Sequence, residues 1–414
     1  MASGVSEEEP GRPCSPRQVS KNHHGSHRHL LHDPFISFPR DMHALIVPTG
    51  RPSAAMRTAL LVAGKLDCTL VALCSKGSVA KEVAELPEAA GVKLIAIDTE
   101  ALPEAALPPF RTDAVLRNTR FERKTDTSAK RNFGLKLAKL IGWEQIAFLD
   151  DDIEVPEPLD LRDAAGLAAR FAGVGLTVEG MPDNSVVCHA YREAGGCQKV
   201  FVGGGALAVA VSKTNSFFPN IYNEDWFFLL NDEGLQPTTS IGRVEQKEYD
   251  PFATVDRARR EELGDCLAEG LFWLLDNGGS LRDVGPAHWA EALDRRAGFV
   301  NDVTEMVAAM WRSERRDRML ASLQAARRRA GFITPELCMS YIEAWRADRF
   351  IWRRHLQDAC RDYVVPGSRA RKYRRSLAGV SALLLSLGLP RDACHLSLPK
   401  EFYKNPADLD LPAA

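Results

Sequence analysis

Short apolar runs alternate with amphipathic segments between residues 43 and 150. Four runs are rich in Val, Ile, Leu and Ala and end at turn residues, which predicts buried strands. These predicted strands are 43–49, 69–75, 92–99 and 145–150. The segments 53–64 and 128–142 have helical spacing and end in glycine. Strands that alternate with helices predict an α/β fold built on a mostly parallel sheet.

The pattern changes in the second half of the chain. Further apolar runs predict strands at 173–180, 199–212 and 238–246, so we expect the sheet to continue with a mixed part. From about Val255 the spacing becomes helical. The helical runs are 257–275, 297–330 and 335–363. This division predicts an α/β domain over 41–254 and a C-terminal α-helical subdomain over 255–400.

The two ends of the chain lack apolar periodicity. Residues 1–40 combine Pro, Ser, Gly and charged residues, which predicts a disordered tail, and 401–414 is interpreted as a C-terminal tail. Five of the ten histidines lie in 23–32. A metal-binding tract is one interpretation of this cluster. We favour a solvated tail, because nothing nearby in the sequence would hold the imidazoles in a fixed geometry.

Composition narrows the class of partner. The 53 Lys and Arg residues nearly balance the 55 Asp and Glu residues, which argues against nucleic acid or an anionic membrane as the main partner. No apolar stretch reaches the roughly 18–20 residues of a membrane helix. Nine scattered cysteines without a C-x-x-C pair indicate a reducing cytoplasm and neither a zinc nor a disulfide framework. We expect a cytoplasmic protein that binds small molecules. Its oligomeric state is left open.

The strongest chemical signal is the run of three carboxylates at Asp150, Asp151 and Asp152. It follows the predicted strand 145–150, and ligands of parallel α/β sheets bind at the carboxyl ends of strands. Adjacent carboxylates repel one another unless a cation compensates them. Mg²⁺ or Mn²⁺ prefers such oxygen ligands and commonly bridges them to a diphosphate. The alternative is an acidic turn that caps the next segment.

A second acidic motif, Glu224-Asp225-Trp226, begins an aromatic helical segment. Acidic residues in a first helical turn often only complement the helix dipole. An aspartate beside a tryptophan also suits a general base next to a platform for a sugar ring. Between the two acidic motifs lies Gly203-Gly204-Gly205, within the predicted strand 199–212. Glycines there indicate either tight packing or a floor for a closely approaching substrate.

The ordered set PTGRP, AKRN, LDDD, GGGALAV and NEDW resembles the GT-A fold nucleotide-sugar glycosyltransferases, with glycosyltransferase family 2 the most similar group. The resemblance covers roughly residues 43–250. It implies a Rossmann-like mixed sheet flanked by helices. It also implies that Asp150 and Asp152 hold the metal on the donor diphosphate, with Asp151 near the ribose or sugar. Glu224 and Asp225 match the catalytic motif, in which the aspartate is the base.

The resemblance also assigns binding residues. The first loop, which touches the nucleoside, matches Pro48, Thr49, Gly50 and Arg51. The segment near the nucleotide matches Lys130, Arg131 and Asn132. Gly204 and Gly205 would line the donor site, and Trp226 would contact the acceptor.

The Q-x-x-R-W motif of processive synthases is absent, which favours a single inverting transfer to each acceptor. UDP-glucose is the default donor and a hydroxyl of a small molecule is the acceptor. Overall likeness to natural-product glycosyltransferases suggests an aminocyclitol such as validoxylamine A, in antibiotic biosynthesis. Two alternatives stay open. A nucleotidyltransferase acting on a sugar phosphate should carry a longer basic Gly-rich first loop, and a non-catalytic nucleotide-sugar-binding module would not need to keep its acidic motifs.

Overall fold

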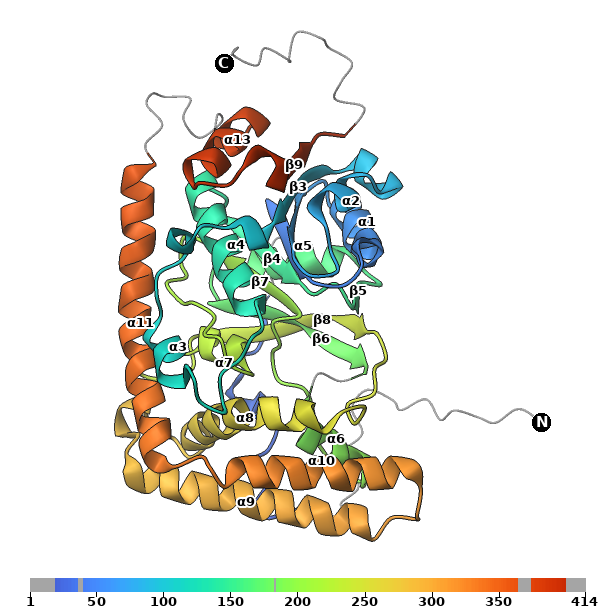
Figure 1. Cartoon of the computed structure of the whole chain (residues 1–414), viewed down its shortest axis with the longest axis vertical. Coiled ribbons are helices and arrows are strands. Elements are labelled where there is room, and N and C mark those ends of the chain that lie inside the picture. Colours follow the sequence, from blue (N-terminus) through green and yellow to red (C-terminus); the bar gives the residue numbers. More distant parts are fainter. Residues whose placement is uncertain (1–18, 36–39, 182–183, 364–373, 400–414) are drawn as a thin grey trace, which may run out of the picture.

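The computed structural model describes residues 19–35, 40–181, 184–363 and 374–399. Over these residues the chain forms a nine-stranded mixed sheet with helices on both faces (Figure 1). This confirms the α/β prediction. The predicted tails over 1–18, 36–39 and 401–414 lie outside the described residues.

The first half of the sheet is parallel, and its strands lie where the sequence predicts them. Its neighbours run in the order β3-β2-β1-β4. The strands are β1 (Ala44–Thr49), β2 (Thr69–Cys74), β3 (Lys93–Asp98) and β4 (Gln145–Leu149). The connecting helices are α1 (Arg57–Lys65), α2 (Ala80–Ala84), α3 (Arg111–Leu116) and α4 (Thr127–Ile141). Since β2 and β4 lie on opposite sides of β1, the connections diverge at β1 and β4, which opens a crevice at the carboxyl ends of these strands.

The second half of the sheet is mixed, as the sequence predicts. Strand β7 (Ala206–Ala210) runs antiparallel to both β4 and β6 (Gly173–Gly180). Strand β8 (Thr238–Gln246) is parallel to β6, and the short β5 (Ile153–Glu154) is antiparallel to β8. The predicted strand 199–212 is therefore shorter than expected, and the three glycines precede β7 instead of lying inside it.

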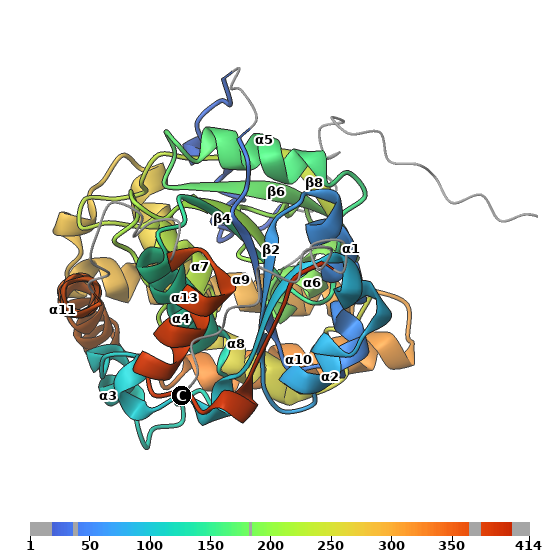
Figure 2. The same ribbon diagram turned by 90° about the horizontal axis from the view of Figure 1, so that it is seen from above.

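Side chains alternate along the strands and divide the core between two faces of the sheet. Ile46 belongs to a cluster that α4, α11 (Pro335–Asp362) and α13 (Leu377–Ser386) cover. Its neighbour Leu45 belongs to a cluster that α1, α2 and α5 (Leu159–Leu167) cover. Figure 2 shows α1 and α4 on opposite sides of the sheet. Both faces are buried, which explains why the strands read as continuous apolar runs.

The expected C-terminal helical region is only partly helical and shares its core with the sheet. Helices α8 (Val255–Asp276), α9 (Pro286–Ala308) and α10 (Glu314–Ala330) gather with α6 (Val186–Glu193) at one end of the molecule (Figure 1). Yet Leu267 on α8 and Trp345 on α11 belong to the same cluster as Phe148 of β4. Strand β9 (Cys394–Ser397) then pairs antiparallel with β3. The prediction of a separate helical unit over 255–400 is therefore wrong for the segment that returns to the sheet.

The predicted tail is also wrong for residues 19–32, which we call the N-terminal strap. His27 is 1% exposed and lies between Glu269 and Asp276 of α8, at 3.0 and 2.6 Å. Arg28 donates through Nη1 to the carbonyl oxygen of Val200 at 3.0 Å. The prediction of a disordered tail was wrong here because it considered only residues that are close to the segment in the sequence. The buried carboxylates that hold it lie about 240 residues further along the chain.

Two expectations from the sequence concern membrane-spanning helices and disulfide bonds. Among the described residues no helix combines the length and hydrophobicity that crossing a membrane requires. Seven cysteines in this part of the chain are free thiols, whereas Cys197 is disulfide-bonded. The expectation of a chain without disulfides therefore does not hold at Cys197.

Candidate functional site

A cavity of about 230 Å³ lies at the carboxyl edge of the sheet, and we call it the carboxyl-edge cavity. Residues from β4, the turn before β7, the start of α7 (Glu224–Leu229) and one face of α8 line it. The lining includes Arg131, Asp150, Gly203, Gly205, Glu224, Asp225, Trp226, Asp265 and Glu269. The structure thus brings Asp150, Gly203, Gly205 and the second acidic motif into one cavity, whereas Asp151 and Asp152 are not among its lining residues.

Arg131 is the central cation of this site. Its Nη2 donates to both oxygens of Asp150 at 2.8 and 3.0 Å, and its Nη1 donates to Oε1 of Glu224 at 2.8 Å. A Cβ at Gly204 would lie 2.6 Å from Nη1, so glycine leaves the room that the guanidinium occupies. Arg131 is buried, and its fixed bonds orient the two acids. The resemblance had placed Arg131 near the nucleotide. These bonds leave its guanidinium little freedom to move toward one.

Asp225 is held by backbone amides. The N–H of Gly204 donates to Oδ2 at 2.5 Å, and the N–H of Trp226 donates to Oδ1 at 2.9 Å. Burial raises the pKa of Asp225 to about 6, the charge of Glu224 acts in the same direction, and Arg131 opposes both. No arginine or lysine of the described residues forms an ion pair with Asp225. A partly buried carboxylate that two backbone amides hold in place, and whose pKa is raised to about 6, suits a general base.

Glu224 is less suited to the same role. It pairs with Arg131 at 2.8 Å and lies 3.9 Å from Arg123, so its carboxylate is already engaged by two cations. The residue before it, Asn223, has φ of 63° in the left-handed region, and its Nδ2 donates to Oδ1 of Asp265 at 3.1 Å. This conformation turns the chain sharply into α7 and places Glu224 and Asp225 in its first turn.

The first loop and the aspartate run are bonded to each other. Thr49 donates through Oγ1 to Asp151 at 2.7 Å, and Arg51 contacts both Asp151 and Asp152. Asp151 is buried, and these bonds fasten the first loop to the aspartate run. Its expected position near a ribose or sugar stays a prediction. Arg51 has a half-exposed side chain, whereas Asp152 is mostly buried.

Three predicted donor-binding residues have structural positions instead. Lys130 donates through Nζ to the carbonyl oxygen of Thr49 and to Oγ of Ser75, both at 2.6 Å. Asn132 uses both ends of its amide on the backbone of Phe218, at 2.8 Å each. Pro48 is buried within β1. These side chains support the loops around the cavity and do not line it. Gly50 is exposed beside the same loop.

Asp150 and Asp152 have the chemistry of a site for Mg²⁺ or Mn²⁺. Burial raises the pKa of Asp152, and the charges of Asp150 and Asp151 add to the effect while Arg51 opposes it. A cation beside Asp152 would relieve this repulsion. Among the described residues no three His, Cys, Asp or Glu side chains are grouped as metal ligands.

Several lining residues were missed in the sequence. Asp265 and Glu269 lie one turn apart on α8, and both are buried. Asn184 and Gln198 lie nearby in the wall of the cavity. The signal was present in EELGDCLAEG (261–270), where four carboxylates alternate with Leu, Ala, Gly and Cys and no basic residue occurs. A sequence reading treats such residues as a solvated helix face, because their burial depends on partners distant in the chain.

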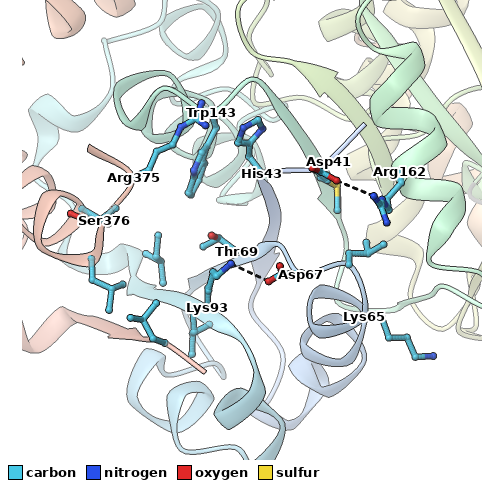
Figure 3. A pocket seen from close by; sticks show the side chains of 17 residues that line it. Asp41, His43, Lys65, Asp67, Thr69, Lys93, Trp143, Arg162, Arg375 and Ser376 are labelled. Carbon is cyan, nitrogen blue, oxygen red and sulfur yellow. Dashed lines mark hydrogen bonds and ion pairs between the residues drawn. The ribbon is translucent and has the colours of Figure 1, made fainter. Parts of the chain in front are cut away.

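A larger cavity, of about 700 Å³, lies at the opposite, amino ends of β1, β2 and β3 (Figure 3). We call it the amino-edge cavity. Its charged side chains pair at the rim, with Lys93 to Asp67 at 3.0 Å and Arg162 to Asp41 at 2.9 Å. Both aspartates are almost fully exposed. The amino-edge cavity contains no buried acidic cluster, so the carboxyl-edge cavity is the better candidate for chemistry.

No protein-family model matches the chain, and no curated protein matches it in sequence. The functional assignment therefore depends on the geometry of the site.

Proposed function

We propose that the protein is a metal-dependent, inverting, non-processive glycosyltransferase of GT-A type. It would transfer a sugar from a nucleoside diphosphate donor, with UDP-glucose as the first choice, to a hydroxyl of a small polyhydroxylated acceptor. One observation carries the proposal. The carboxyl-edge cavity holds Asp150, the unpaired carboxylate Asp225 and the ring of Trp226 together.

The donor side follows from the crevice between β1 and β4. The strand order favours a ligand there, outside the carboxyl ends of the two strands. The first loop carries Arg51, whose half-exposed guanidinium is within reach of a phosphate that approaches Asp152. Mg²⁺ or Mn²⁺ held by Asp150 and Asp152 would stabilise the charge that develops on the leaving diphosphate.

The base side follows from Asp225. The acceptor hydroxyl attacks C1 of the donor sugar while the bond from C1 to the diphosphate oxygen breaks. Its proton passes to the carboxylate of Asp225, which the amides of Gly204 and Trp226 hold in place. A single displacement from the face opposite the diphosphate inverts C1. The buried surroundings of Asp225 keep water from competing for the donor.

The acceptor side is defined by size and by an aromatic ring. The volume of about 230 Å³ is below the roughly 300–1,000 Å³ of pockets for drug-sized ligands, which suits one sugar-sized ring. Trp226 lies among the lining residues and packs against Phe201 and Phe272, with ring centroids 5.2 and 4.6 Å apart. A ring fixed in this way offers an apolar face to an acceptor at little entropic cost.

A thermal-shift screen with UDP, CTP and GTP, each with and without Mn²⁺, tests the proposal. We expect UDP to stabilise the protein only when metal is present. The variant Asp152→Ala should lose this shift, and Asp41→Ala, at the amino edge, should keep it. A preference for CTP or GTP would favour a nucleotidyltransferase and contradict the proposal, as would a UDP shift that EDTA does not change.

A further inference from the structure

The wall of the carboxyl-edge cavity that α8 contributes is unusually acidic. Asp265 and Glu269 are four residues apart on this helix and therefore share one face. Both line the cavity and are buried, with exposures of 3% and 7%. We call these two residues the acidic wall. A buried carboxylate needs a compensating partner, so the cations around this wall decide what it does.

The cations behind the acidic wall are shared. Arg296 donates to both oxygens of Glu262 and, through Nη2, to Asp265, with all three distances at 2.9 Å. His27 is shared in the same way between Glu269 and Asp276. The guanidinium of Arg295 lies nearby and donates to the carbonyl oxygen of His23.

His29 also lies 3.1 Å from Asp276. Asp265 and Glu269 line the cavity, whereas Arg295, Arg296, His27 and His29 are not among its lining residues, so the acidic wall presents carboxylates to a ligand. Burial raises the pKa of Asp265 to about 7; Arg296 opposes this shift, and the charges of Glu269 and Glu262 add to it. On the other side of the cavity, Arg131 is shared by Asp150 and Glu224, and Arg123 lies 3.9 Å from Glu224. Asp225 forms no ion pair with an arginine or lysine of the described residues. The whole cavity therefore favours a cationic ligand.

An unused hydrogen-bond donor lies in the same cavity. Asn184 is 7% exposed and lines the cavity, and its Nδ2 finds no hydrogen-bond partner among the described residues. A buried amide donor without a partner is costly, so a native structure seldom keeps one unless a ligand or water completes it. An oxygen atom of a ligand, such as a hydroxyl, would satisfy this group.

We propose that the acidic wall binds a protonated amine of a polyhydroxylated acceptor. The ammonium group would lie against Asp265 and Glu269, and a hydroxyl oxygen of the same molecule would accept from Nδ2 of Asn184. Trp226, whose ring meets that of His27 edge-on with centroids 5.6 Å apart, lies beside the wall and adds a cation–π contact. This inference rests on the proposed function, because it names the acceptor class of the same site.

Paired ligands test the charge requirement on the wild-type protein. Calorimetric titrations at pH 7 would compare glucosamine with glucose, and scyllo-inosamine with scyllo-inositol. N-Acetylglucosamine serves as a neutral relative of the first amine. We expect an amine to bind about tenfold more tightly than its neutral partner, and acetylation to remove the gain. Equal affinities within both pairs, or no binding of either amine at millimolar concentration, would overturn the proposal.

Variants locate the effect. Glu269→Gln keeps the shape of the side chain and leaves Asp276 to pair with His27, so we expect the amine preference to fall to about twofold or less. Asn184→Ala should weaken both members of a pair equally. Glu261→Gln removes a buried carboxylate of α8 that pairs with Arg257 outside the cavity, and it should leave the preference intact. An amine preference that survives in Glu269→Gln and Asp265→Asn would contradict the assignment. If a variant fails to melt cooperatively, the acetylated ligand on the wild type still decides.

The titrations contain neither donor nor metal, which separates this inference from the proposed function. Amine selectivity without any transfer from a UDP-sugar would support the acidic wall and remove the glycosyltransferase proposal. Transfer from a UDP-sugar that prefers the neutral member of each pair would support the glycosyltransferase proposal and contradict the role of the acidic wall.

Discussion

The two cavities differ more in the placement of charge than in size. The amino-edge cavity is larger, about 700 Å³ against 230 Å³, yet its acids, Asp41 and Asp67, pair at an exposed rim. In the carboxyl-edge cavity, Asp265 is buried and Asp225 is partly buried, and loss of solvent raises the pKa of both. The comparison teaches that volume is a poor guide to a reactive site. Charges that the fold holds away from water are the better guide.

The direction of the strands explains this difference. Thr49 ends β1, Arg51 follows it, and the aspartates 150–152 follow β4, so their polar groups converge at the carboxyl edge. At the amino edge, Asp67 precedes β2 and Lys93 begins β3, and these single charges pair with each other near the solvent. The following predictions compare the same kind of change at the two edges.

The largest expected effect comes from the proposed metal ligands. Asp152→Ala and Asp150→Asn should each lower transfer about 10³-fold or more, because the leaving diphosphate would lose its bound cation. Asn is chosen at position 150 so that a hydrogen bond to Arg131 survives. The matched change at the amino edge, Asp67→Ala, should leave the rate within about twofold. Steady-state release of UDP measures all three, and equal rates in all of them would contradict the metal role.

The next effect concerns the base. Asp225→Asn keeps the size of the side chain but removes the proton acceptor, so kcat should fall about 10²–10⁴-fold while metal-dependent UDP binding remains. Single-turnover rates at saturating donor are the measurement. If Asp225 only caps α7, asparagine would be a nearly neutral replacement, and a wild-type rate would leave Glu224 as the remaining candidate.

A histidine at each cavity, His27 and His43, should make the stability of the protein depend on pH in opposite directions. Burial opposes protonation of His27, but hydrogen bonds to Asp276 and Glu269 outweigh it and raise its pKa to about 9. The contribution of His27 to the free energy of unfolding is at most about 3 kcal/mol. It is complete below pH 6.5 and is lost as pH rises through 9. Burial, with the charge of Arg375, lowers the pKa of His43 at the amino-edge cavity. Its contribution is complete above pH 6.5 and is lost on acidification.

Melting temperatures of His27→Gln, His43→Gln and the wild type between pH 5 and pH 9.5 check this pair. The difference between wild type and His27→Gln should shrink toward high pH, and the corresponding difference for His43→Gln should shrink toward low pH. Parallel curves for the two variants would show that the environments assigned to these histidines are wrong.

The smallest effect is expected from the aromatic wall. Trp226→Phe should raise the acceptor KM about fivefold with little change in kcat, since a smaller ring loses contact area and no proton transfer. Trp143→Phe at the amino-edge cavity should leave KM unchanged. Initial rates over a range of acceptor concentrations separate the two constants. A loss in kcat alone for Trp226→Phe would mean that the ring positions Asp225 and does not bind the acceptor.

Local patterns were enough to predict the frame of the fold and part of the site. The strands β1 to β4 and helix α4 lie within one or two residues of their predicted bounds, because each follows a short-range periodicity. The acidic motifs at Asp150 and Asp225 were found because each begins or ends an element. That these motifs belong to one site was implied by the resemblance and not by the local patterns.

Long-range contacts explain what the sequence did not reveal. The strap was read as solvated because His27 finds its carboxylates on α8, far along the chain. Asn132 looked available to a nucleotide, yet the backbone of Phe218 occupies its amide. Strand β9 completes the far edge of the sheet from the C-terminal region, where helical spacing dominates. Each of these features depends on a partner that no local pattern specifies.

The most direct test of the account is a crystal structure of the protein with UDP and Mn²⁺. The account predicts an anomalous manganese peak at about 2.1 Å from carboxylate oxygens of Asp150 and Asp152, with the diphosphate bound to the ion at the carboxyl edge. A nucleotide bound in the amino-edge cavity, or a manganese peak that touches neither aspartate, would contradict it.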